Sequence, residues 1–442
     1  MKRAGLLFSA LLASVMIAQT FSAPAPAQSS LVIVKDHKFY VNNKPYYYIG
    51  ANYWYGSLLG LEKDRRKGVE RLRKELDFLK ANGVTNLRLM AGAEGSGMIN
   101  GVIRVGPPLQ PRQGEFDEEV LNGLDLILSE MGKRNLKAVV FLSNNWEWSG
   151  GFQQYLTWNG LVPEALKTRK LTWDEQRDIV SKFYSCEPCK ESYNKQMNLI
   201  LERTNRYNKQ KYTEDPTIMA WELANEPRPM RAVAVDAYRK WISDVAAMIK
   251  AKDKNHLVTI GHEGQIGTED MKLYEEIHAD KNIDYLTIHI WPKNWNWFTG
   301  HQVEEGFPVV VEKTFNYIDQ HIIVAEKLNK PLVIEEFGLP RDKHSFDASA
   351  STLLRDTFYS KIFSVVEKQR CLNGYIAGVN FWAFGGTSRP VKGQTNWKQG
   401  DHYMGDPPME EQGLNTVFDS DKSTWDLIKQ FSKSLEELKP RC

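Results

Sequence analysis

The chain has 442 residues, of which 42% are hydrophobic and 25% are charged, and these are the proportions of a folded globular protein. Its length suits one large domain or two ordinary ones, with enough residues for an extensive core. The formal net charge is +2, so the chain lacks the basic excess that binding to nucleic acid or to an anionic membrane surface requires.

Residues 1–27 have the features of an export signal. Lys2 and Arg3 form a positive start, residues 6–17 are mostly apolar but too short to span a bilayer, and Ala23 and Ala27 each end a stretch of small residues. A membrane anchor is the alternative. We therefore predict a secreted or periplasmic protein, with no membrane association after signal removal, whose residues 28–442 form a single domain.

Four cysteines follow the signal, and export favours disulfide formation. Cys186 and Cys189 have the spacing of a local disulfide, a redox pair or half of a zinc site. Zinc is disfavoured because the chain has no second Cys-x-x-Cys and no nearby pair of histidines. We expect the local disulfide, with Cys371 and Cys442 then joined, although the sequence leaves all three pairings open.

Apolar and amphipathic segments alternate along the chain after a short β-hairpin predicted at 30–48. Helices are expected around Leu72 and Leu124 and at 232–250, 311–328, 351–369 and 424–438. Several strand candidates are apolar without strict alternation, as strands covered on both faces are. The eight candidates occupy residues 47–53, 86–90, 137–142, 218–223, 257–261, 285–291, 332–337 and 378–384.

Eight strands separated by helices predict a (β/α)8 TIM barrel. An open doubly wound sheet is the alternative, but the first strand is not followed by the Gly-rich turn that dinucleotide binding requires. Three long insertions, 144–215, 293–308 and 385–419, each follow the carboxyl end of a strand. Barrel enzymes build their sites at this end, so we expect these βα loops to form a substrate cleft.

Two glutamates lie at the ends of apolar runs. Glu226 closes the sequence Ile-Met-Ala-Trp-Glu-Leu-Ala-Asn-Glu, and Glu336 closes the sequence Pro-Leu-Val-Ile-Glu-Glu. A carboxylate at this place is held rigidly and still reaches a ligand, and cleavage of a glycosidic bond needs two of them. The alternatives are a helix-capping role for Glu226 and a salt bridge at the edge of the core for Glu336. Glu335 is expected to alternate to the other side of its strand and to take no part in the chemistry.

The ordered pair Asn225-Glu226-Pro227 and Glu336-Phe337-Gly338 resembles glycoside hydrolase family 5, in the large clan A of retaining (β/α)8 glycosidases. The resemblance extends over nearly the whole mature chain. The longer strings at 221–229, 289–295 and 405–413 are similar to endo-β-1,4-mannanases of that family.

The resemblance implies that Glu226 is the acid/base and Glu336 the nucleophile of a double displacement, with their carboxyl groups about 5–5.5 Å apart. Glu226 must begin protonated, so we expect partial burial and the charge of Glu336 to raise its pKa.

The same resemblance implies five substrate-binding or supporting residues. Arg88 lies beneath the nucleophile and keeps it ionised, and Asn225 binds near the sugar 2-hydroxyl. Arg228 contacts the leaving side, His289 follows the sixth strand, and Trp382 stacks on the sugar at the cleavage point.

Trp291 departs from the family pattern, because the wider family carries tyrosine two residues after the histidine. An indole N–H can donate a hydrogen bond to the nucleophile but cannot accept one. Further aromatic residues follow the third and sixth strands, and we expect about half of them to contact sugar: Trp146, Trp148, Trp158, Trp291, Trp295 and Trp297.

Together these features imply a single catalytic domain that acts as a retaining endo-β-1,4-mannanase on mannan, glucomannan or galactomannan. We expect a monomer that needs no cofactor or metal. The alternatives are a β-1,4-endoglucanase of the same family, an exo-acting β-mannosidase or mannobiohydrolase, and a non-catalytic carbohydrate-binding barrel. No residue by itself distinguishes an axial from an equatorial 2-hydroxyl, so the preference for mannan rests on the resemblance.

Overall fold

A computed structural model describes residues 31–437. The predicted signal at 1–27 and Cys442 lie outside this range. Within it, no helix combines the length and the apolar character needed to cross a bilayer.

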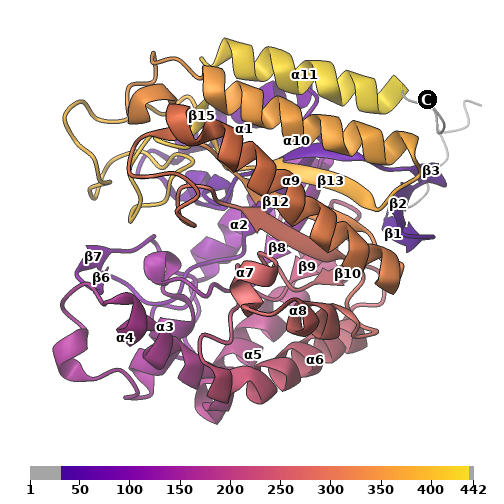
Figure 1. The fold of residues 1–442 in the computed structure, drawn as a ribbon. Coiled ribbons are helices and arrows are strands. Elements are labelled where there is room, and N and C mark those ends of the chain that lie inside the picture. Colours follow the sequence, from indigo (N-terminus) through magenta and orange to yellow (C-terminus); the bar gives the residue numbers. More distant parts are fainter. Residues whose placement is uncertain (1–30, 438–442) are drawn as a thin grey trace, which may run out of the picture.

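Eight parallel strands form a nearly closed central barrel (Figure 1), in the order β10-β9-β8-β5-β4-β13-β12-β11. Each lies where a strand was predicted, with bounds that differ by three residues at most, so the predicted TIM barrel is confirmed over the open sheet. The strands are β4 (Tyr48–Asn52), β5 (Asn86–Met90), β8 (Lys137–Phe141), β9 (Ile218–Glu222), β10 (Leu257–Thr259), β11 (Leu286–Ile290), β12 (Leu332–Phe337) and β13 (Ile376–Phe381).

The seam of the barrel lies between β10 and β11, where individual hydrogen bonds take the place of a regular ladder. The Asp284 amide donates to the Val258 carbonyl at 2.8 Å. Two threonine hydroxyls also cross the seam, Thr259 to the Tyr285 carbonyl at 3.0 Å and Thr287 to the His262 carbonyl at 2.8 Å.

Helices cover the outside of the barrel, and their local sequences explain where they begin and which face they bury. In α1 (Arg65–Ala81) the Asp64 carboxylate caps the first turn by accepting from the Lys67 amide, and Leu72, Leu76 and Leu79 are buried on one face. The other outer helices are α2 (Glu118–Gly132), α6 (Val235–Lys252), α8 (Met271–His278), α9 (Val303–Leu328), α10 (Leu353–Cys371) and α11 (Lys422–Glu437).

The helix α9 begins eight residues before the predicted start at 311, inside the predicted insertion 293–308. Pro308, at the end of the predicted insertion, is disfavoured inside a helix because it lacks a backbone N–H. In the structure Pro308 lies in the second turn of α9, after Glu304 and Glu305, whose charges favour a helix start.

The predicted N-terminal hairpin is a three-stranded antiparallel sheet of β1 (Val32–Lys35), β2 (Lys38–Val41) and β3 (Lys44–Pro45). Two-residue turns join its strands, and their residues, Asp36-His37 and Asn42-Asn43, have the positive φ angles that such turns require. The sheet lies at the end of the barrel opposite the long loops (Figure 1), and its Phe39 packs edge-on against Tyr285, 5.2 Å between ring centroids. It therefore closes the bottom of the barrel.

The insertion at 144–215 folds into α3 (Gly151–Trp158), α4 (Trp173–Val180) and α5 (Glu187–Leu201). Cys186 and Cys189 are joined by a disulfide at the start of α5. The insertion at 385–419 connects the parallel pair β14 (Phe384–Gly386) and β15 (Val417–Phe418), and Asp406 fixes it by accepting from the Thr416 hydroxyl at 2.6 Å. The proposed bond between Cys371 and Cys442 stays a prediction, because Cys442 is outside the described residues.

Two fully buried histidines between the barrel and its outer helices predict a loss of stability in acid. Burial lowers the pKa of His278 to about 3 and that of His321 to about 4, against about 6.5 in an unfolded chain. The unfolded state therefore binds more protons below pH 6.5, so the stabilisation is complete above that pH and is lost as the pH falls toward 4. In full, His321 contributes up to roughly 3 kcal/mol to this loss, and His278, whose contribution falls further down to pH 3, up to roughly 5 kcal/mol.

We expect His321→Gln to be less stable than the parent at pH 7.5, because His321 bonds to the Tyr317 carbonyl and the Gln265 amide. The free energy of urea unfolding should differ less between the parent and His321→Gln at pH 4.5 than at pH 7.5, because the parent loses the contribution of neutral His321 in acid. A difference that stays constant with pH would mean that His321 is not held neutral in the folded protein.

Candidate active site

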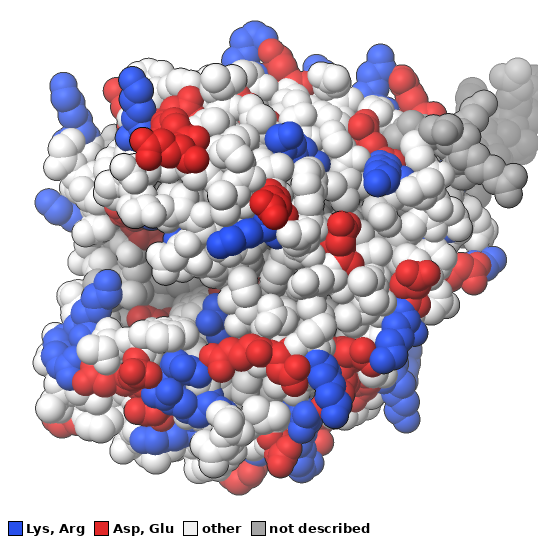
Figure 2. All heavy atoms as spheres, viewed as in Figure 1, with Lys and Arg blue, Asp and Glu red and all other residues white. Residues whose placement is uncertain are grey.

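A cleft of about 570 Å³ opens at the carboxyl ends of the barrel strands, and the hollow at the left of Figure 2 lies at this end of the molecule. All three predicted insertions contribute to its walls, as Trp173, Asn294 and Met409 show. The prediction that these loops form a cleft is confirmed. Both glutamates line the cleft, together with four of the predicted substrate-binding residues: Asn225, Arg228, Trp291 and Trp382.

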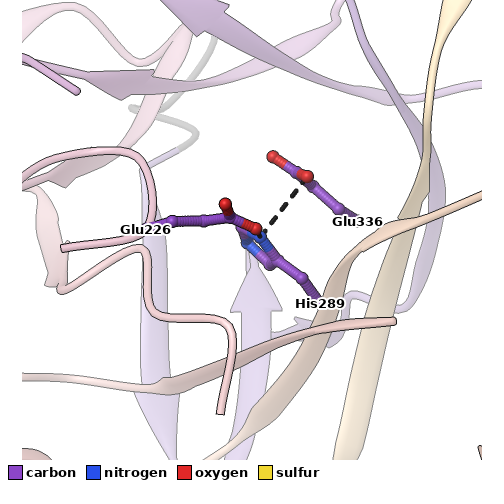
Figure 3. A group of neighbouring side chains, drawn as sticks. All are labelled: Glu226, His289 and Glu336. Atoms are coloured by element: carbon purple, nitrogen blue, oxygen red, sulfur yellow. Dashed lines mark hydrogen bonds and ion pairs between the residues drawn. The ribbon is translucent and has the colours of Figure 1, made fainter. Parts of the chain in front are cut away.

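Glu226 and Glu336 face each other across the floor of the cleft. A carboxylate oxygen of each and a ring nitrogen of His289 all lie within 4.8 Å of one another (Figure 3). This short separation fits a retaining pair, whereas an inverting pair is about 6.5–9.5 Å apart. Glu226 is 7% exposed and Glu336 is 3% exposed, so both are reachable from the cleft but largely shielded from water.

The backbone at Glu226 is in the left-handed region, with φ of 51°. Such a conformation costs a non-glycine residue about 1–3 kcal/mol and persists only where neighbours enforce it. The Glu226 amide donates to the Gly261 carbonyl at 2.8 Å, and the Tyr238 hydroxyl donates to the Pro227 carbonyl at 3.0 Å. These bonds hold the acid/base candidate pointing into the cleft.

Arg88 lies beneath Glu336, as predicted, and is fully buried. Its guanidinium donates to Glu336 Oε1 at 2.5 Å and to Asn225 Oδ1 at 2.7 Å. It also forms a bidentate pair with Glu222, at 2.8 and 2.5 Å. Glu222 was not among the predicted site residues, although its place at the end of an apolar strand was a signal, because a buried carboxylate needs a cation as partner.

The Trp291 indole N–H donates to Glu336 Oε2 at 3.0 Å. The departure from the family's tyrosine therefore keeps a hydrogen-bond donor on this carboxylate. Both Glu336 oxygens accept hydrogen bonds, and this fits the ionised form of the carboxylate. Burial and the charge of Glu226 nevertheless raise the pKa of Glu336, and the charges of His289 and Arg88 only partly oppose this rise.

The prediction that Glu335 points away from the site is wrong. Ile288 pairs with Ile334 and His289 pairs with Glu336, so Glu335 is an extra residue in β12. This irregularity breaks the alternation and turns two successive side chains toward the barrel interior. Glu335 Oε2 lies 3.5 Å from His289 Nε2 and 3.7 Å from Arg88 Nε.

His289 connects three carboxyl groups. Its Nδ1 lies 2.6 Å from Glu226 Oε1 and 3.4 Å from Glu336 Oε2, while Nε2 faces Glu335. Burial by itself would lower the pKa of His289, but the charge of Glu336 and the hydrogen bonds and charge of its other carboxylate neighbours raise it to about 10. His289 is therefore an imidazolium at neutral pH.

The pKa of Glu226 is lowered, contrary to the prediction. Burial raises it, but the hydrogen bond and charge of His289, the charge of Arg228 and the Trp146 indole together outweigh burial. The Trp146 N–H donates to Glu226 Oε2 at 2.5 Å, so both oxygens of Glu226 accept hydrogen bonds. The proton that an acid catalyst needs is held on His289, across one short hydrogen bond.

The two ends of the cleft differ. Trp382 packs edge-on against Trp291 beside Glu336, with ring centroids 5.8 Å apart. Arg228 lies at the Glu226 end and forms a bidentate pair with Glu263, at 2.7 and 2.6 Å. Of the six loop tryptophans considered as sugar contacts, four line the cleft, namely Trp146, Trp148, Trp291 and Trp295, whereas Trp158 and Trp297 do not.

Comparison with known proteins gives a consistent result. A family model described as glycoside hydrolase family 5, β-mannosidase-like, matches residues 29–440. Mannan endo-1,4-β-mannosidase 4 of Solanum lycopersicum is 28% identical over 390 residues, which cover 85% of this chain and 89% of the relative.

Solved structures agree. A glycoside hydrolase family 5 mannosidase from Rhizomucor miehei is 31% identical, and the two structures match with a TM-score of 0.83. The match covers 92% of this chain and 98% of the mannosidase. An endo-1,4-β-mannanase from the same fungus is 21% identical, with a TM-score of 0.66 over 92% of this chain and 100% of that one, and it shares the fold.

Glu335 offers a direct test of how His289 is kept charged. Glu335→Gln removes a carboxylate whose Oε2 lies 3.5 Å from His289 Nε2 and which raises the pKa of His289, so this pKa should fall. If turnover needs the proton on His289, the alkaline limb of the pH profile of kcat/KM moves to lower pH, and KM at the pH optimum changes little because Glu335 does not line the cleft. Glu326→Gln, on the exposed face of α9, is the control. An alkaline limb that does not move would contradict this role for Glu335.

Proposed function

Because the chain belongs to glycoside hydrolase family 5, we propose that it is an exported, monomeric, retaining endo-β-1,4-mannanase that cuts mannan, glucomannan or galactomannan. The observation that carries the proposal is the proximity of Glu226 and Glu336 in an open cleft. The composition of residues 1–27 supports export, and the names of the plant relatives support a mannan substrate.

In the first step Glu336 Oε attacks the anomeric carbon of the sugar beside Trp382. The bond from this carbon to the glycosidic oxygen breaks, and the leaving oxygen takes a proton from Glu226. An ester then joins the sugar to Glu336. Arg88 and Trp291 direct the attacking carboxylate. Glu336 loses its negative charge as the ester forms, and the Glu226–His289 pair at the same time gives one proton to the leaving oxygen, so the net charge of the three groups does not change.

The position of the proton before this step follows from the raised pKa of His289 and the lowered pKa of Glu226. In the free protein His289 holds it and Glu226 is ionised, with Nδ1 and Oε1 2.6 Å apart. Transfer along this bond gives a neutral imidazole and a protonated Glu226 without a net change in charge. A sugar in the cleft favours the transfer, because it displaces water from Glu226 and disfavours its charged form.

In the second step Glu226, ionised after the first, removes a proton from a water molecule on the face vacated by the leaving group. The water oxygen attacks the anomeric carbon, the ester bond to Glu336 breaks, and the sugar leaves with its original configuration. The proton gained by Glu226 then passes to His289 along the hydrogen bond between them, which restores the ionised Glu226 and the imidazolium. The site is then ready for another substrate.

An exo-acting β-mannosidase is the second candidate, and one observation favours it. The Rhizomucor miehei mannosidase matches this chain with a TM-score of 0.83, against 0.66 for the endo-mannanase of the same fungus. The two candidates share the chemistry and differ in where the polymer enters the cleft.

The test of substrate and mode is hydrolysis of galactomannan and of a soluble cellulose under the same conditions, with the lengths of the products recorded. We expect cleavage of galactomannan and, early in the reaction, products longer than two sugars. Mannose or mannobiose as the sole early product would show that the protein acts in the exo mode and not in the endo mode. Faster cleavage of cellulose than of galactomannan would contradict the mannan assignment. If neither polysaccharide is cleaved, the non-catalytic carbohydrate-binding barrel would be the remaining candidate.

We expect Glu226→Gln and Glu336→Gln each to lower kcat on galactomannan by roughly 10³-fold or more, because each removes one of the two groups that make and break bonds. The two variants should differ on dinitrophenyl β-mannoside, whose leaving group needs no proton. Glu226→Gln should still release dinitrophenol in a rapid first turnover, whereas Glu336→Gln should not. Similar behaviour of the two variants in this assay would contradict their separate roles.

A further inference from the structure

Glu226, His289 and Glu336 have the side chains and the spacing of a metal site. One oxygen of each glutamate and a ring nitrogen of the histidine lie within 4.8 Å of one another (Figure 3), and all three residues are buried. Zn²⁺ binds imidazole nitrogen and carboxylate oxygen, and a site with three protein ligands keeps a fourth position for water. The two-step chemistry uses these groups to move a proton and to attack carbon, and it makes no use of their capacity to bind a cation.

The distances between the ligand atoms are close to those that a bound ion imposes. His289 Nδ1 lies 2.6 Å from Glu226 Oε1 and 3.4 Å from Glu336 Oε2. Ligand atoms that each lie about 2.0–2.2 Å from Zn²⁺ are about 3–3.5 Å apart in a tetrahedral or octahedral arrangement. The Glu226 carboxylate therefore needs to withdraw by about 0.5–1 Å to admit the ion, which a small rotation of its side chain achieves.

The donors around the two carboxylates orient them as ligands. The oxygen of Glu226 that faces away from the imidazole accepts from the Trp146 indole at 2.5 Å. The corresponding oxygen of Glu336 accepts from Arg88 at 2.5 Å. The inner oxygen of Glu336 also accepts from the Trp291 N–H at 3.0 Å and keeps a second lone pair for an ion. Outer hydrogen bonds of this kind fix the ligands of metal sites in their binding orientation.

Glu335 supplies the contact that orients the imidazole. A histidine bound to a metal through one ring nitrogen almost always donates its other N–H to a carboxylate, a carbonyl or water. Glu335 Oε2 lies 3.5 Å from His289 Nε2, and Glu335 is 1% exposed. Neither oxygen of Glu335 has a hydrogen-bond partner among residues 31–437. This buried carboxylate is therefore placed to hold the ring from the side opposite Nδ1.

The charges and the openness of the site also suit a divalent cation. The ion takes the place of the Nδ1 proton of His289, and this proton passes to water. The exchange adds one positive charge between Glu226 and Glu336, where shielding from water strengthens the attraction. Both glutamates line the cleft, so the ion enters from the cleft, and its fourth position faces the water there.

We propose that Glu226, His289 and Glu336, which we call the trio, bind a divalent transition-metal cation such as Zn²⁺, and that this ion inhibits the protein by competing with the sugar. The bound ion holds both carboxylates, so Glu336 cannot attack the anomeric carbon and Glu226 cannot give or take a proton. A sugar at the cleavage point excludes the ion in turn. The inference does not depend on the proposed function, because the folded chain presents the three ligands whatever the substrate is.

A second group of metal-binding side chains provides a control. His301 and His344 have ring centroids 3.8 Å apart, and His344 Nε2 lies 3.4 Å from Glu411 Oε1. His344→Gln removes a ligand from this group and leaves the trio intact. Glu147→Gln is the control for carboxylates in the cleft, because Glu147 lines the cleft but does not belong to the trio.

The test is isothermal titration calorimetry of the protein with ZnCl₂ at pH 7 in the absence of substrate. The parent should bind Zn²⁺ at the trio, and MgCl₂ should give no binding, because Mg²⁺ prefers an octahedron of oxygen ligands. Glu226→Gln, His289→Gln and Glu336→Gln should each weaken Zn²⁺ binding by at least about 10–100-fold, the loss that removal of an outer partner alone causes. His344→Gln and Glu147→Gln should keep the parental affinity.

Two results would overturn the site. One is no binding of Zn²⁺ by the parent, or the same affinity in the parent and in the trio variants. The other is loss of binding in His344→Gln, which would place the ion on the pair of histidines instead. Circular dichroism shows whether each variant is folded. If His289→Gln does not fold, the two glutamate variants decide the question.

Inhibition gives a second measurement. With galactomannan as substrate, ZnCl₂ should raise KM and leave kcat nearly unchanged, and EDTA should restore the parental rate. A decrease in kcat at constant KM would contradict competition with the sugar. A parent that binds Zn²⁺ but cleaves no polysaccharide would overturn the proposed function and leave this inference standing. A parent that cleaves galactomannan and binds no Zn²⁺ would overturn this inference alone.

Discussion

The buried guanidinium of Arg88 is the contact on which the arrangement of the site depends. It bonds to side chains from three other parts of the barrel: Asn52 of β4, Glu222 of β9 and Glu336 of β12. Burial by itself would lower the pKa of Arg88, but its carboxylate neighbours raise it well above the ordinary value, so it is charged at every accessible pH. Removing one partner of such a buried network is costly, because it leaves a charge without compensation. The position of the nucleophile is therefore tied to the stability of the barrel.

Beneath the cleft, four carboxyl groups face only two cations. Glu222, Glu226, Glu335 and Glu336 surround Arg88 and His289 in a region shielded from water. Burial raises the pKa of Glu222 to about 8, against the opposing charge of Arg88. The charge of Glu336 and the hydrogen bond and charge of Glu226 outweigh burial and explain why His289 holds its proton so strongly. Glu226 and Glu336 have the same side chain but take different roles because Arg88 and Trp291 bind Glu336 whereas the imidazolium of His289 binds Glu226. The acid and the nucleophile are distinguished by their neighbours.

Much of this arrangement could be predicted from the sequence. Apolar runs separated by amphipathic segments located all eight strands, because strand position depends on local composition. Glu226 and Glu336 could be placed at one end of the barrel because parallel strands bring their carboxyl ends together, whereas the position of Arg88 beneath Glu336 was implied by the resemblance to family 5. The donor role of Trp291 followed from the chemistry of its side chain, and the structure shows that hydrogen bond.

Other features depend on three-dimensional detail that local pattern does not contain. The extra residue in β12 changes the direction of Glu335, and an alternation rule assumes that no such irregularity occurs. The lowered pKa of Glu226 depends on which atoms of His289 and Trp146 reach it, and a count of charges nearby could not supply that. Trp173 lies in an insertion, where its exposure is set by the packing of α4 and not by any repeating pattern. Of the aromatic residues in the cleft walls, Trp146, Trp148, Trp291 and Trp295 were predicted as candidate sugar contacts, whereas Trp173 was not.

The central claim is that Glu226 and Glu336 are close enough for a double displacement, and the configuration of the first product tests it most directly. Proton NMR of a manno-oligosaccharide digest, recorded before the sugars interconvert, shows which anomer is released at the new reducing end. The account predicts that the β-anomer appears first and the α-anomer follows slowly. Release of the α-anomer first would show that water attacks the substrate directly, and the proposed role of Glu336 would then be wrong.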